Sequence, residues 1–543
     1  MNLSRSAQLG VYGGILIALG SYGSGANRYR GGLVHALGLD WITYGHGQIF
    51  CEIVIWVGIA LLLVSWLRIG RELLFWNGTI RDIVAGSTHS GDTTDAAAPD
   101  AAAPANAGSD ESTLRRFNSI LLAWAIPLSL AAPLFSRDVY SYLMQGAMVR
   151  DGFDPYTEGA ATNPGPMLLE VSADWRNTTT PYGPLHLGIG EVITRVVGDN
   201  ITVGVILYRI VCLLGFAAIA WSIPRIAREL GANPAFAQWL GVLNPLVLLH
   251  LIAGMHNEAL MVGLVSLALV AALRMEHMRG GLVAAVLIGI GVALKATAVL
   301  ALPFVVWIVL TRREPITTVQ EMLRKIPAIV GVGIALVAVC VGTLAVVTWL
   351  TGSSWGWISE ISGNTKVINP LAAPSAVAGV VSGVMAWFND DIGFNVIVSH
   401  TRVISSFIML VGLVISWFYF RATPRNNVAG MIAAYVVACV FNAVALPWYY
   451  ASLLTPMGTI RPPRWVIQGT VLFTFILSLS FAGGGNHRFY DVPWMIIITV
   501  LGWLAVGWLT TGKFSWKYPW RDDKTAADTD STVAPLSRST EVA

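Results

Sequence analysis

Residues 131–156 read AAPLFSRDVYSYLMQGAMVRDGFDPY, and they mark a point where an apolar segment meets a polar one. Apolar residues continue to Phe135, and Arg137 and Asp138 follow almost at once. Charged side chains lie at the ends of membrane-spanning helices because burying them in hydrocarbon is costly. The stretch therefore predicts the end of a membrane-spanning helix and the beginning of a segment at the membrane surface.

The whole chain has the composition of a membrane protein. It has 543 residues, of which 55% are hydrophobic and 12% are charged, and its mean hydropathy is +0.64. Soluble domains carry roughly 25% charged residues, so a soluble protein with one very large core is hard to reconcile with this composition. Because a spanning helix needs roughly 20 residues, the apolar runs predict an all-α polytopic membrane protein with about 13–14 transmembrane helices.

The sequence lacks the signals of nucleic-acid binding, nucleotide binding, disulfide frameworks and metal sites. The net charge is only +3, so nothing suggests a nucleic-acid partner. There is no G-x-x-x-x-G-K-[ST] loop and no Rossmann setting for G-x-G-x-x-G, which argues against a nucleotide ligand. The 4 cysteines lie in or beside apolar runs without C-x-x-C spacing, so neither a disulfide framework nor a metal site is predicted.

Composition divides the chain into four parts. Residues 1–83 predict a transmembrane helix pair, and residues 84–116 an Ala/Pro/Asp-rich cytoplasmic spacer, disordered because it cannot build a core. Residues 117–511 predict the main transmembrane domain, in which residues 136–200 form one long outer loop carrying surface helices. Residues 512–543 predict a disordered cytoplasmic tail.

Lysine and arginine in the short loops predict the orientation in the plasma membrane. All the basic loops fall on the cytoplasmic side, and both termini with them, if residues 373–388 do not cross. The turns that carry Glu258, Lys295 and Trp448 then fall on the outer face together with Asp138, although they were not used to set the topology. We therefore expect one functional site at the outer, periplasmic face.

Asp138 is the candidate catalytic residue. Asp138, Tyr142 and Gln145 share one face of the helix that the composition of residues 138–150 predicts along the membrane surface. Either Ser136 or Asp138 could serve simply as the N-cap of this helix. The Asp138 carboxylate could also act at the lipid–water boundary as a general base toward a hydroxyl group.

Two further carboxylates could share that role. Asp154 lies in a Phe-Asp-Pro-Tyr turn, and a structural role is the better interpretation because Asp-Pro dipeptides favour turns. Glu258 lies in the turn MHNEAL, residues 255–260, between two apolar helices. Glu258 could share the catalytic role, or it could simply be a carboxylate at the membrane interface without a role in the chemistry.

Three basic residues are candidate contacts for a lipid phosphate. Arg137 adjoins Asp138, and its planar guanidinium suits either a carboxylate or a phosphate. Lys295 interrupts an apolar run, where a charge is costly unless it snorkels or finds a partner. His256 is the third candidate. The candidate sugar or acceptor contacts, for which anchoring in the membrane interface is the alternative, are Tyr140, Tyr142, Tyr156, Tyr182, Asn257, Trp448 and Tyr449.

Four stretches together resemble the actinobacterial polyprenol-phosphate-mannose-dependent α-1,6-mannosyltransferases, the mannopyranosyltransferase A and B family. They are SRDVYSYLMQGAMVRDGFDPY (136–156), TPYGPLHL (180–187), LNPLVLLHLIAGMHNEALMVGL (243–264) and GVALKATAVLALPF (291–304). The N-terminal helix pair and the Ala-rich spacer look closer to the B-type enzymes.

The resemblance implies a GT-C glycosyltransferase, a helical bundle whose site faces outward. It implies transfer of mannose from polyprenyl-phosphate mannose, without a nucleotide sugar, to the 6-hydroxyl of a lipid-anchored α-1,6-mannan such as a lipomannan or lipoarabinomannan core. Asp138 matches the family position of the catalytic carboxylate, in the first large outer loop after a transmembrane helix. The usual paired acidic motif is absent, because Arg137 and Val139 flank Asp138, so Asp154 or Glu258 could share the role.

This resemblance also implies an inverting reaction, in which Asp138 acts as general base and a β-linked donor gives an α-linked product. Phosphate is a good leaving group, so neither a metal nor another cofactor is expected. The expected partners are the lipid-linked donor, the mannan acceptor and membrane lipids. The rival classes are a secondary transporter or lipid flippase, which would show internal repeats, and a non-catalytic scaffold, which would not need Asp138.

Overall fold

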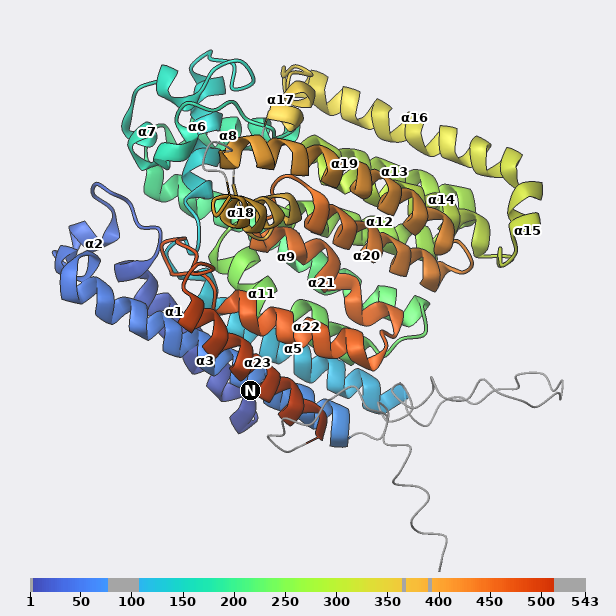
Figure 1. Cartoon of the computed structure of the whole chain (residues 1–543), viewed down its shortest axis with the longest axis horizontal. Coiled ribbons are helices and arrows are strands. Elements are labelled where there is room, and N and C mark those ends of the chain that lie inside the picture. The colour runs from blue at the N-terminus through green and yellow to red at the C-terminus, as the bar shows by residue number, and fades with distance from the viewer. Residues whose placement is uncertain (1–2, 77–106, 364–367, 389–392, 512–543) are drawn as a thin grey trace, which may run out of the picture.

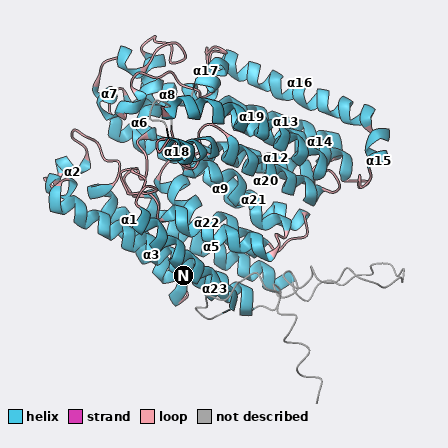
Figure 2. Ribbon diagram, viewed as in Figure 1, coloured by secondary structure: helices cyan, strands magenta, loops and turns pink. Residues whose placement is uncertain are grey.

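The structure is a computed structural model that describes residues 3–76, 107–363, 368–388 and 393–511 (Figure 1). Within these ranges the regular structure is helical, apart from an isolated bridge between Phe481 and His487 (Figure 2). The predicted tail, residues 512–543, lies outside the described residues. The prediction of an all-α chain is confirmed for the part that the structure describes.

The helices follow one another along the chain with short connections. The first half contains α1 (Arg5–Ser24), α2 (Leu33–Ala36), α3 (Gly45–Trp76), α5 (Ala107–Ser129), α6 (Asp138–Arg150), α7 (Pro166–Glu170), α8 (Pro184–Val197), α9 (Ile201–Glu229), α10 (Pro234–Ala237), α11 (Pro245–Leu248) and α12 (Glu258–Arg274). The second half contains α13 (His277–Leu294), α14 (Leu302–Thr311), α15 (Val319–Arg324), α16 (Ile326–Leu350), α17 (Trp357–Gly363), α18 (Ala373–Met385), α19 (Phe394–Tyr419), α20 (Pro424–Phe441), α21 (Ala451–Met457), α22 (Arg464–Ser478) and α23 (Val492–Thr511).

The chain is a multi-pass membrane protein. Among the described residues, 6 helices are long and apolar enough to cross a membrane: Gly45–Glu72, Ile201–Glu229, His277–Leu294, Ile326–Leu350, Phe394–Tyr419 and Val492–Thr510. A further pair, Pro234–Val242 and Pro245–Ala253, passes the same test as one span bent by 56°. This criterion finds fewer spans than the sequence estimate.

The estimate from sequence also counted apolar segments that the structure divides into short helices. Residues 297–311 fall in η6 (Ala296–Ala301) and α14, and residues 447–460 fall in η8 (Pro447–Tyr450), α21 and η9 (Gly458–Ile460). The backbone of α21 is buried within the bundle, and irregular backbone at membrane depth is tolerated where protein surrounds it. These apolar segments are therefore not single long helices.

The N-terminal helix pair is part of the main bundle. Helices α1 and α3 pack so closely that a Cβ atom on Gly13 would lie 2.7 Å from the carbonyl oxygen of Gly58. Trp66 of α3 stacks on Trp239, with ring centroids 5.1 Å apart. Each indole N–H of this pair donates to the carbonyl oxygen of the other residue at 2.9 Å. Paired hydrogen bonds between buried tryptophans join α3 to the centre of the bundle.

The last residues of the predicted spacer are helical. Its residues 84–106 lie outside the described residues, but residues 107–116 are the first turns of α5. The prediction of disorder was wrong for this last part. Ion pairs hold it, because Glu111 bonds Arg228 of α9 at 2.7 Å and Arg116 lies 3.3 Å from Glu72 of α3.

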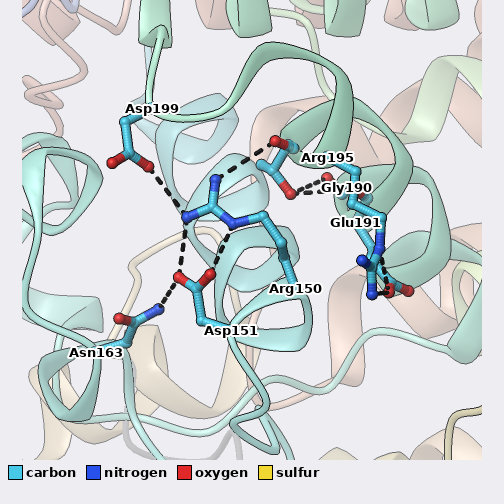
Figure 3. A network of polar contacts seen from close by, with 8 residues as sticks. Arg150, Asp151, Asn163, Gly190, Glu191, Arg195 and Asp199 are labelled. Carbon is cyan, nitrogen blue, oxygen red and sulfur yellow. Dashed lines mark hydrogen bonds and ion pairs between the residues drawn. The ribbon is translucent and has the colours of Figure 1, made fainter.

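The long loop gathers at one end of the bundle. In Figure 1, helices α6, α7 and α8 lie together near α2 and α17, and α15 lies at the opposite end. Arg150 ties the C-terminal end of α6 to α8 and the turn after it, because its guanidinium donates to the Thr194 carbonyl oxygen at 3.4 Å and bonds Asp199 at 3.0 Å (Figure 3). These contacts make the loop a folded cap on that end of the bundle.

Helices α6 and α8 cross at two glycines. A Cβ atom on Gly146 would lie 2.1 Å from the carbonyl carbon of Gly190, so no larger side chain fits at that position without moving a helix. Because α6 begins with Asp138, this crossing sets the position of the candidate catalytic residue.

Substituting Gly146→Val should therefore destabilise the protein. Overpacking a close contact costs typically about 1–3 kcal/mol, so we expect a lower midpoint of thermal unfolding in detergent. Gly342→Val in α16 is the matched control, because a Cβ atom there meets nothing within 4 Å. Equal midpoints for the two variants would contradict this description of the crossing.

Candidate active site

Two sharp turns bring the candidate residues to the end of the bundle. Phe135 and Met255 have positive φ values of 64° and 55°, and they directly precede the segments that begin at Ser136 and His256. Left-handed backbone at a bulky residue is unfavourable and is often found at functional sites. The two turns lie against each other, because the N–H of Leu134 donates to the carbonyl oxygen of Ala253 at 3.3 Å.

Asp138 is the first residue of α6, but its carboxylate does not cap the helix. The N-cap is Arg137, which makes no side-chain capping bond, and Ser136 Oγ accepts the Asp138 N–H at 3.0 Å. The Asp138 carboxylate instead accepts a hydrogen bond from the Tyr142 hydroxyl at 3.3 Å. The interpretation of Asp138 as a mere N-cap is therefore not supported.

His256 is the second neighbour of Asp138. Its Nδ1 lies 3.3 Å from Asp138 Oδ2, close enough for an ion pair but without hydrogen-bond alignment. His256 is fully buried, whereas the Asp138 side chain is 16% exposed. Burial raises the pKa of Asp138, but His256, Ser136 and the Lys295 charge together hold it below its ordinary value. The carboxylate is thus ionised at neutral pH.

Lys295 forms a buried ion pair with Glu258. Lys295 lies where α13 ends, in extended backbone with φ −154° and ψ 125°, and Glu258 is the first residue of α12. The Lys295 side chain is 11% exposed and the Glu258 side chain 1% exposed. The Lys295 ammonium also lies 3.9 Å from the ring centroid of Tyr449 and 5.8 Å from that of Tyr182. The Lys295 charge, which the sequence predicted at the edge of the bilayer, is therefore buried and paired with Glu258.

A layer of aromatic rings lies behind the carboxylate. The ring of Tyr142 contacts Tyr182 at 5.5 Å, His186 at 4.8 Å and Tyr208 at 5.2 Å between centroids. Burial and the Lys295 charge lower the pKa of His186 to about 3, so its imidazole is neutral at physiological pH. The layer therefore presents rings without adding charge.

His186 is also the centre of a buried polar network. Its Nε2 lies 3.1 Å from the Gln145 amide oxygen, and its Nδ1 lies 3.3 Å from the Asn257 amide nitrogen. The turn before α8 is held against α13, because the Gly183 N–H donates to the Leu294 carbonyl oxygen at 3.2 Å. The network joins the outer loop to the turn that carries His256 and Glu258.

Trp448 covers His256 from the other side. The two rings stack with centroids 3.5 Å apart and planes inclined by 13°. Trp448 is buried, whereas its neighbour Tyr449 is half-buried and contacts the Lys295 ammonium. Together these contacts link Asp138 to Lys295 by two routes, one through Tyr142 and Tyr182 and the other through His256, Trp448 and Tyr449. We call these seven residues with Glu258 the Asp138–Lys295 cluster.

The cluster contains most of the predicted site residues. Asp138, Glu258, Lys295, His256, Tyr142, Tyr182, Trp448 and Tyr449 belong to it, and Asn257 reaches it through His186. Several buried polar atoms here have no hydrogen-bond partner in the described structure, namely both ring nitrogens of His256, Asn257 Oδ1 and Glu258 Oε2. Such atoms are rare in protein interiors and indicate a place for a polar ligand or water.

Arg137 and Tyr140 lie apart from the cluster. The Arg137 guanidinium bonds Glu170 at 2.8 Å and the Asn27 carbonyl oxygen at 2.6 Å, and it stacks over Tyr29 at 3.7 Å. The Tyr140 hydroxyl donates to the Ala26 carbonyl oxygen at 2.8 Å. Both residues join the loop to the segment after α1.

Asp154 and Tyr156 also have other partners. Asp154 is exposed, and its Oδ1 accepts the Tyr156 N–H at 2.9 Å, which is the bond of an Asx turn. Tyr156 is buried, and its hydroxyl lies 3.4 Å from Ser353 Oγ. The geometry of Asp154 agrees with the structural interpretation of its Asp-Pro turn.

Sequence reasoning missed three residues of the site. Glu170 neutralises Arg137 across the loop, and Tyr208 and His186 complete the aromatic layer. Of these three, His186 could have been found from the sequence, because it lies in the stretch TPYGPLHL. Its partner Gln145 lies on the Asp138 face of the predicted helix. Nothing in the pattern around Glu170 distinguishes it from other loop carboxylates.

Comparison with known proteins identifies the family. The model of the alpha-(1->6)-mannopyranosyltransferase N-terminal domain matches residues 7–311, and the model of the MptB C-terminal domain matches residues 374–511. The chain belongs to the alpha-(1->6)-mannopyranosyltransferase family. The predicted family and enzyme class, a glycosyltransferase, are confirmed.

Individual relatives extend the match over nearly the whole chain. The alpha-(1->6)-mannopyranosyltransferase A of Corynebacterium glutamicum is 50% identical over 90% of this chain and 95% of its own length. The A enzyme of Mycobacterium tuberculosis is 33% identical over 89% of this chain and 86% of its own length. The alpha-(1->6)-mannopyranosyltransferase B of C. glutamicum is 30% identical over 66% of this chain and 60% of its own.

These identities do not favour the B-type enzymes. Within C. glutamicum the A enzyme shares 50% identity with this chain and the B enzyme 30%. The expected preference rested on the N-terminal helix pair and an Ala-rich spacer. The low-complexity composition of the spacer records only the absence of a core, so the spacer separates two related enzymes poorly.

Proposed function

We propose that the chain transfers mannose from polyprenyl-phosphate mannose to the 6-hydroxyl of a lipid-anchored α-1,6-mannan. The observation that carries this proposal is that the Asp138 carboxylate, on a side chain 16% exposed, and the Lys295 ammonium, on a side chain 11% exposed, belong to one aromatic-walled cluster at the end of the bundle. The names of the relatives support the sugar and the linkage. The position of the cluster at the end of the membrane-spanning helices supports a donor that lies in the membrane.

Lys295 is the proposed contact for the donor phosphate. An ammonium group has three N–H donors, and Glu258 engages this one at a single carboxylate oxygen. A phosphate that gains charge as it leaves would be stabilised by the remaining donors. Arg137, by contrast, is already bonded to Glu170, so we assign it a positioning role for the segment that carries Asp138.

Asp138 is the proposed general base. In a single displacement it would accept the proton of the mannan 6-hydroxyl while that oxygen forms a bond to the anomeric carbon of the donor. The bond between that carbon and the phosphate oxygen breaks, and polyprenyl phosphate leaves with the electron pair. A β-linked donor then gives an α-linked product. The half-buried rings of Tyr182 and Tyr449 offer the apolar walls that sugar sites commonly use.

The proposed orientation places this site on the outer face of the plasma membrane. Arg137 and Asp138 lie at the end of the bundle with α6 and α8, and the basic segment around α15 lies at the other end (Figure 1). The positive-inside rule assigns the α15 end to the cytoplasm, and both termini with it. No metal is part of the proposed reaction.

A donor-exchange experiment tests this function. Purified full-length protein should transfer radiolabelled mannose from polyprenyl-phosphate mannose to a short α-1,6-mannoside, and should not transfer it from GDP-mannose. The product linkage is read by specific α-1,6-mannosidase digestion. Transfer from GDP-mannose alone would contradict the lipid donor, and no transfer from either donor would favour a transporter.

The acidic limb of the pH–rate profile should report Asp138. Because the pKa of Asp138 is held below its ordinary value, kcat/KM should fall only as pH drops below the ordinary titration range of an aspartate. Any stabilisation from the ionised carboxylate is likewise present above the unfolded-state pKa and lost as pH falls through the folded-state value.

A substitution at His256 tests why the pKa of Asp138 is lowered. His256→Gln removes the group that lowers the pKa most after burial has raised it, so the acidic limb should move to higher pH. His400→Gln, an exposed histidine of α19, is the control and should leave the limb unchanged. An unmoved limb in His256→Gln would show that His256 does not set the ionisation of Asp138.

A further inference from the structure

A large cavity next to the Arg137–Glu170 ion pair has no part in the proposed reaction. Its volume is about 830 Å³, and it lies between the end of α5, the first turns of α9 and residues 27–35 after α1. Of the residues discussed so far, Asn27, Tyr29 and Tyr140 form part of its wall, whereas Asp138 and Lys295 do not line it. The Arg137–Glu170 ion pair, with its stack on Tyr29 and Tyr140, adjoins the same wall.

The lining of this cavity is positively charged. It contains three arginines, Arg28, Arg30 and Arg209, and a single carboxylate, Asp40, which is bonded to His35 at 3.0 Å. Arg28 is partly neutralised, because its Nε lies 3.5 Å from Glu170. The side chain of Arg30 is exposed and makes no ion pair or hydrogen bond with the residues that the structure describes.

Arg209 is the most unusual of these charges. It is buried in α9, a membrane-spanning helix, and its guanidinium donates only to the carbonyl oxygens of Leu128 at 3.2 Å and Ala131 at 2.6 Å. No carboxylate pairs with it within the described part of the chain. Burying a charge at membrane depth is costly, and such a charge normally has an ionic partner or a functional ligand. An anion bound in this cavity would be the ionic partner of Arg209.

Much of the remaining wall is apolar and exposed. Leu130, Ile206 and Leu33 line the cavity and are 65%, 54% and 51% exposed. Thr202, Val205, Ile206 and Arg209 follow one face of α9 at helical spacing. The cavity thus combines cationic groups with an apolar side that is open to acyl chains.

We propose that this cavity binds an anionic phospholipid from the surrounding membrane. The phosphate headgroup lies between Arg30 and Arg209, and one acyl chain follows Leu130, Val205 and Ile206. The site is separate from the donor site at Lys295 and does not depend on the proposed function. The bound lipid fills the space between α1, α5 and α9. It thereby supports Asn27 and Tyr29, which contact Arg137 at the start of α6.

Lipid binding to the full-length protein tests this proposal. The protein, purified in a neutral detergent, is titrated with phosphatidylglycerol or with phosphatidylcholine of the same acyl chains, and bound lipid is counted by native mass spectrometry. We expect at least tenfold tighter binding of phosphatidylglycerol, as one or two charge-assisted hydrogen bonds would give. Equal binding of the two lipids would overturn the proposal.

Matched variants locate the site. Arg30→Gln should weaken phosphatidylglycerol binding about tenfold, and Arg195→Gln, an outer-loop arginine that bonds only Glu191, should not. Ile206→Trp should obstruct the acyl side, whereas Ile210→Trp, one turn along α9, 49% exposed and outside the lining, should not. Unfolding midpoints in neutral detergent show that each variant is folded. Unchanged binding in both Arg30→Gln and Ile206→Trp would overturn the location.

A competition arm distinguishes the phospholipid from the lipid donor. Polyprenyl phosphate is added at increasing concentration to the phosphatidylglycerol complex. We expect the phospholipid to stay bound while polyprenyl phosphate binds as an additional ligand. Displacement of phosphatidylglycerol, one molecule for one, would overturn the proposal and would assign the cavity to the polyprenyl chain instead.

Discussion

Asp138→Asn is expected to lower the rate of mannose transfer by about 10²- to 10⁴-fold, the usual contribution of a general base. The amide keeps the size of the carboxylate and can keep its contact with Tyr142, which lies 3.3 Å away, but it cannot take the acceptor proton. The fold should be retained, because the Asp138 carboxylate does not cap its own helix. The measurement is initial-rate transfer from polyprenyl-phosphate mannose at saturating acceptor.

Asp154→Asn gives the comparison for this result. The Asp154 carboxylate accepts the Tyr156 N–H in an exposed turn, so its loss should affect the turn far more than the chemistry. A large loss of transfer in Asp154→Asn, with normal transfer in Asp138→Asn, would move the base to Asp154. Thermal unfolding of both variants confirms that any loss is chemical.

Lys295→Met is expected to abolish transfer and also to destabilise the protein. Removing one partner of a buried ion pair leaves the other charge uncompensated, which costs about 3–5 kcal/mol. Here the remaining charge is Glu258, whose side chain is 1% exposed. Transfer is lost for a second reason, because Lys295 is the proposed contact for the leaving phosphate.

A double variant separates these two effects. Glu258→Leu combined with Lys295→Met removes both charges, and buried ion pairs replaced in this way often keep or regain stability. The expected result is a restored unfolding midpoint with transfer still absent. Recovery of both stability and transfer would show that the pair only holds α12 against α13 and does not contact the donor.

The sequence predicted the main features of the site because they are local or follow from topology. Asp138 stands directly after an apolar run, and Lys295 interrupts another, so each signals its own position at the bundle end. Once the basic loops orient the chain, Glu258 and Trp448 fall at the same end as Asp138. The structure places all four in one cluster.

Other features depend on contacts that a pattern does not encode. Arg137 was expected at a phosphate, but it is bonded to Glu170, a loop residue without periodic context. The length and hydropathy criterion finds fewer spans than the sequence predicted, because it does not count segments such as residues 447–460, which the structure divides into short buried helices. The sequence did not predict the start of α5, because Ala107 follows a segment rich in Ala, Pro and Asp. The ion pairs of this first part of α5 are made with α3 and α9, which are distant in sequence.

The position of the donor phosphate is the decisive observation. A non-transferable phosphonate analogue of polyprenyl-phosphate mannose, bound to Asp138→Asn in lipid nanodiscs, can be located by electron cryo-microscopy. We predict that a phosphonate oxygen lies within hydrogen-bond distance of the Lys295 ammonium and that the anomeric carbon faces position 138. A phosphonate bound among Arg28, Arg30 and Arg209, with Lys295 bonded to Glu258 alone, would contradict the proposed site.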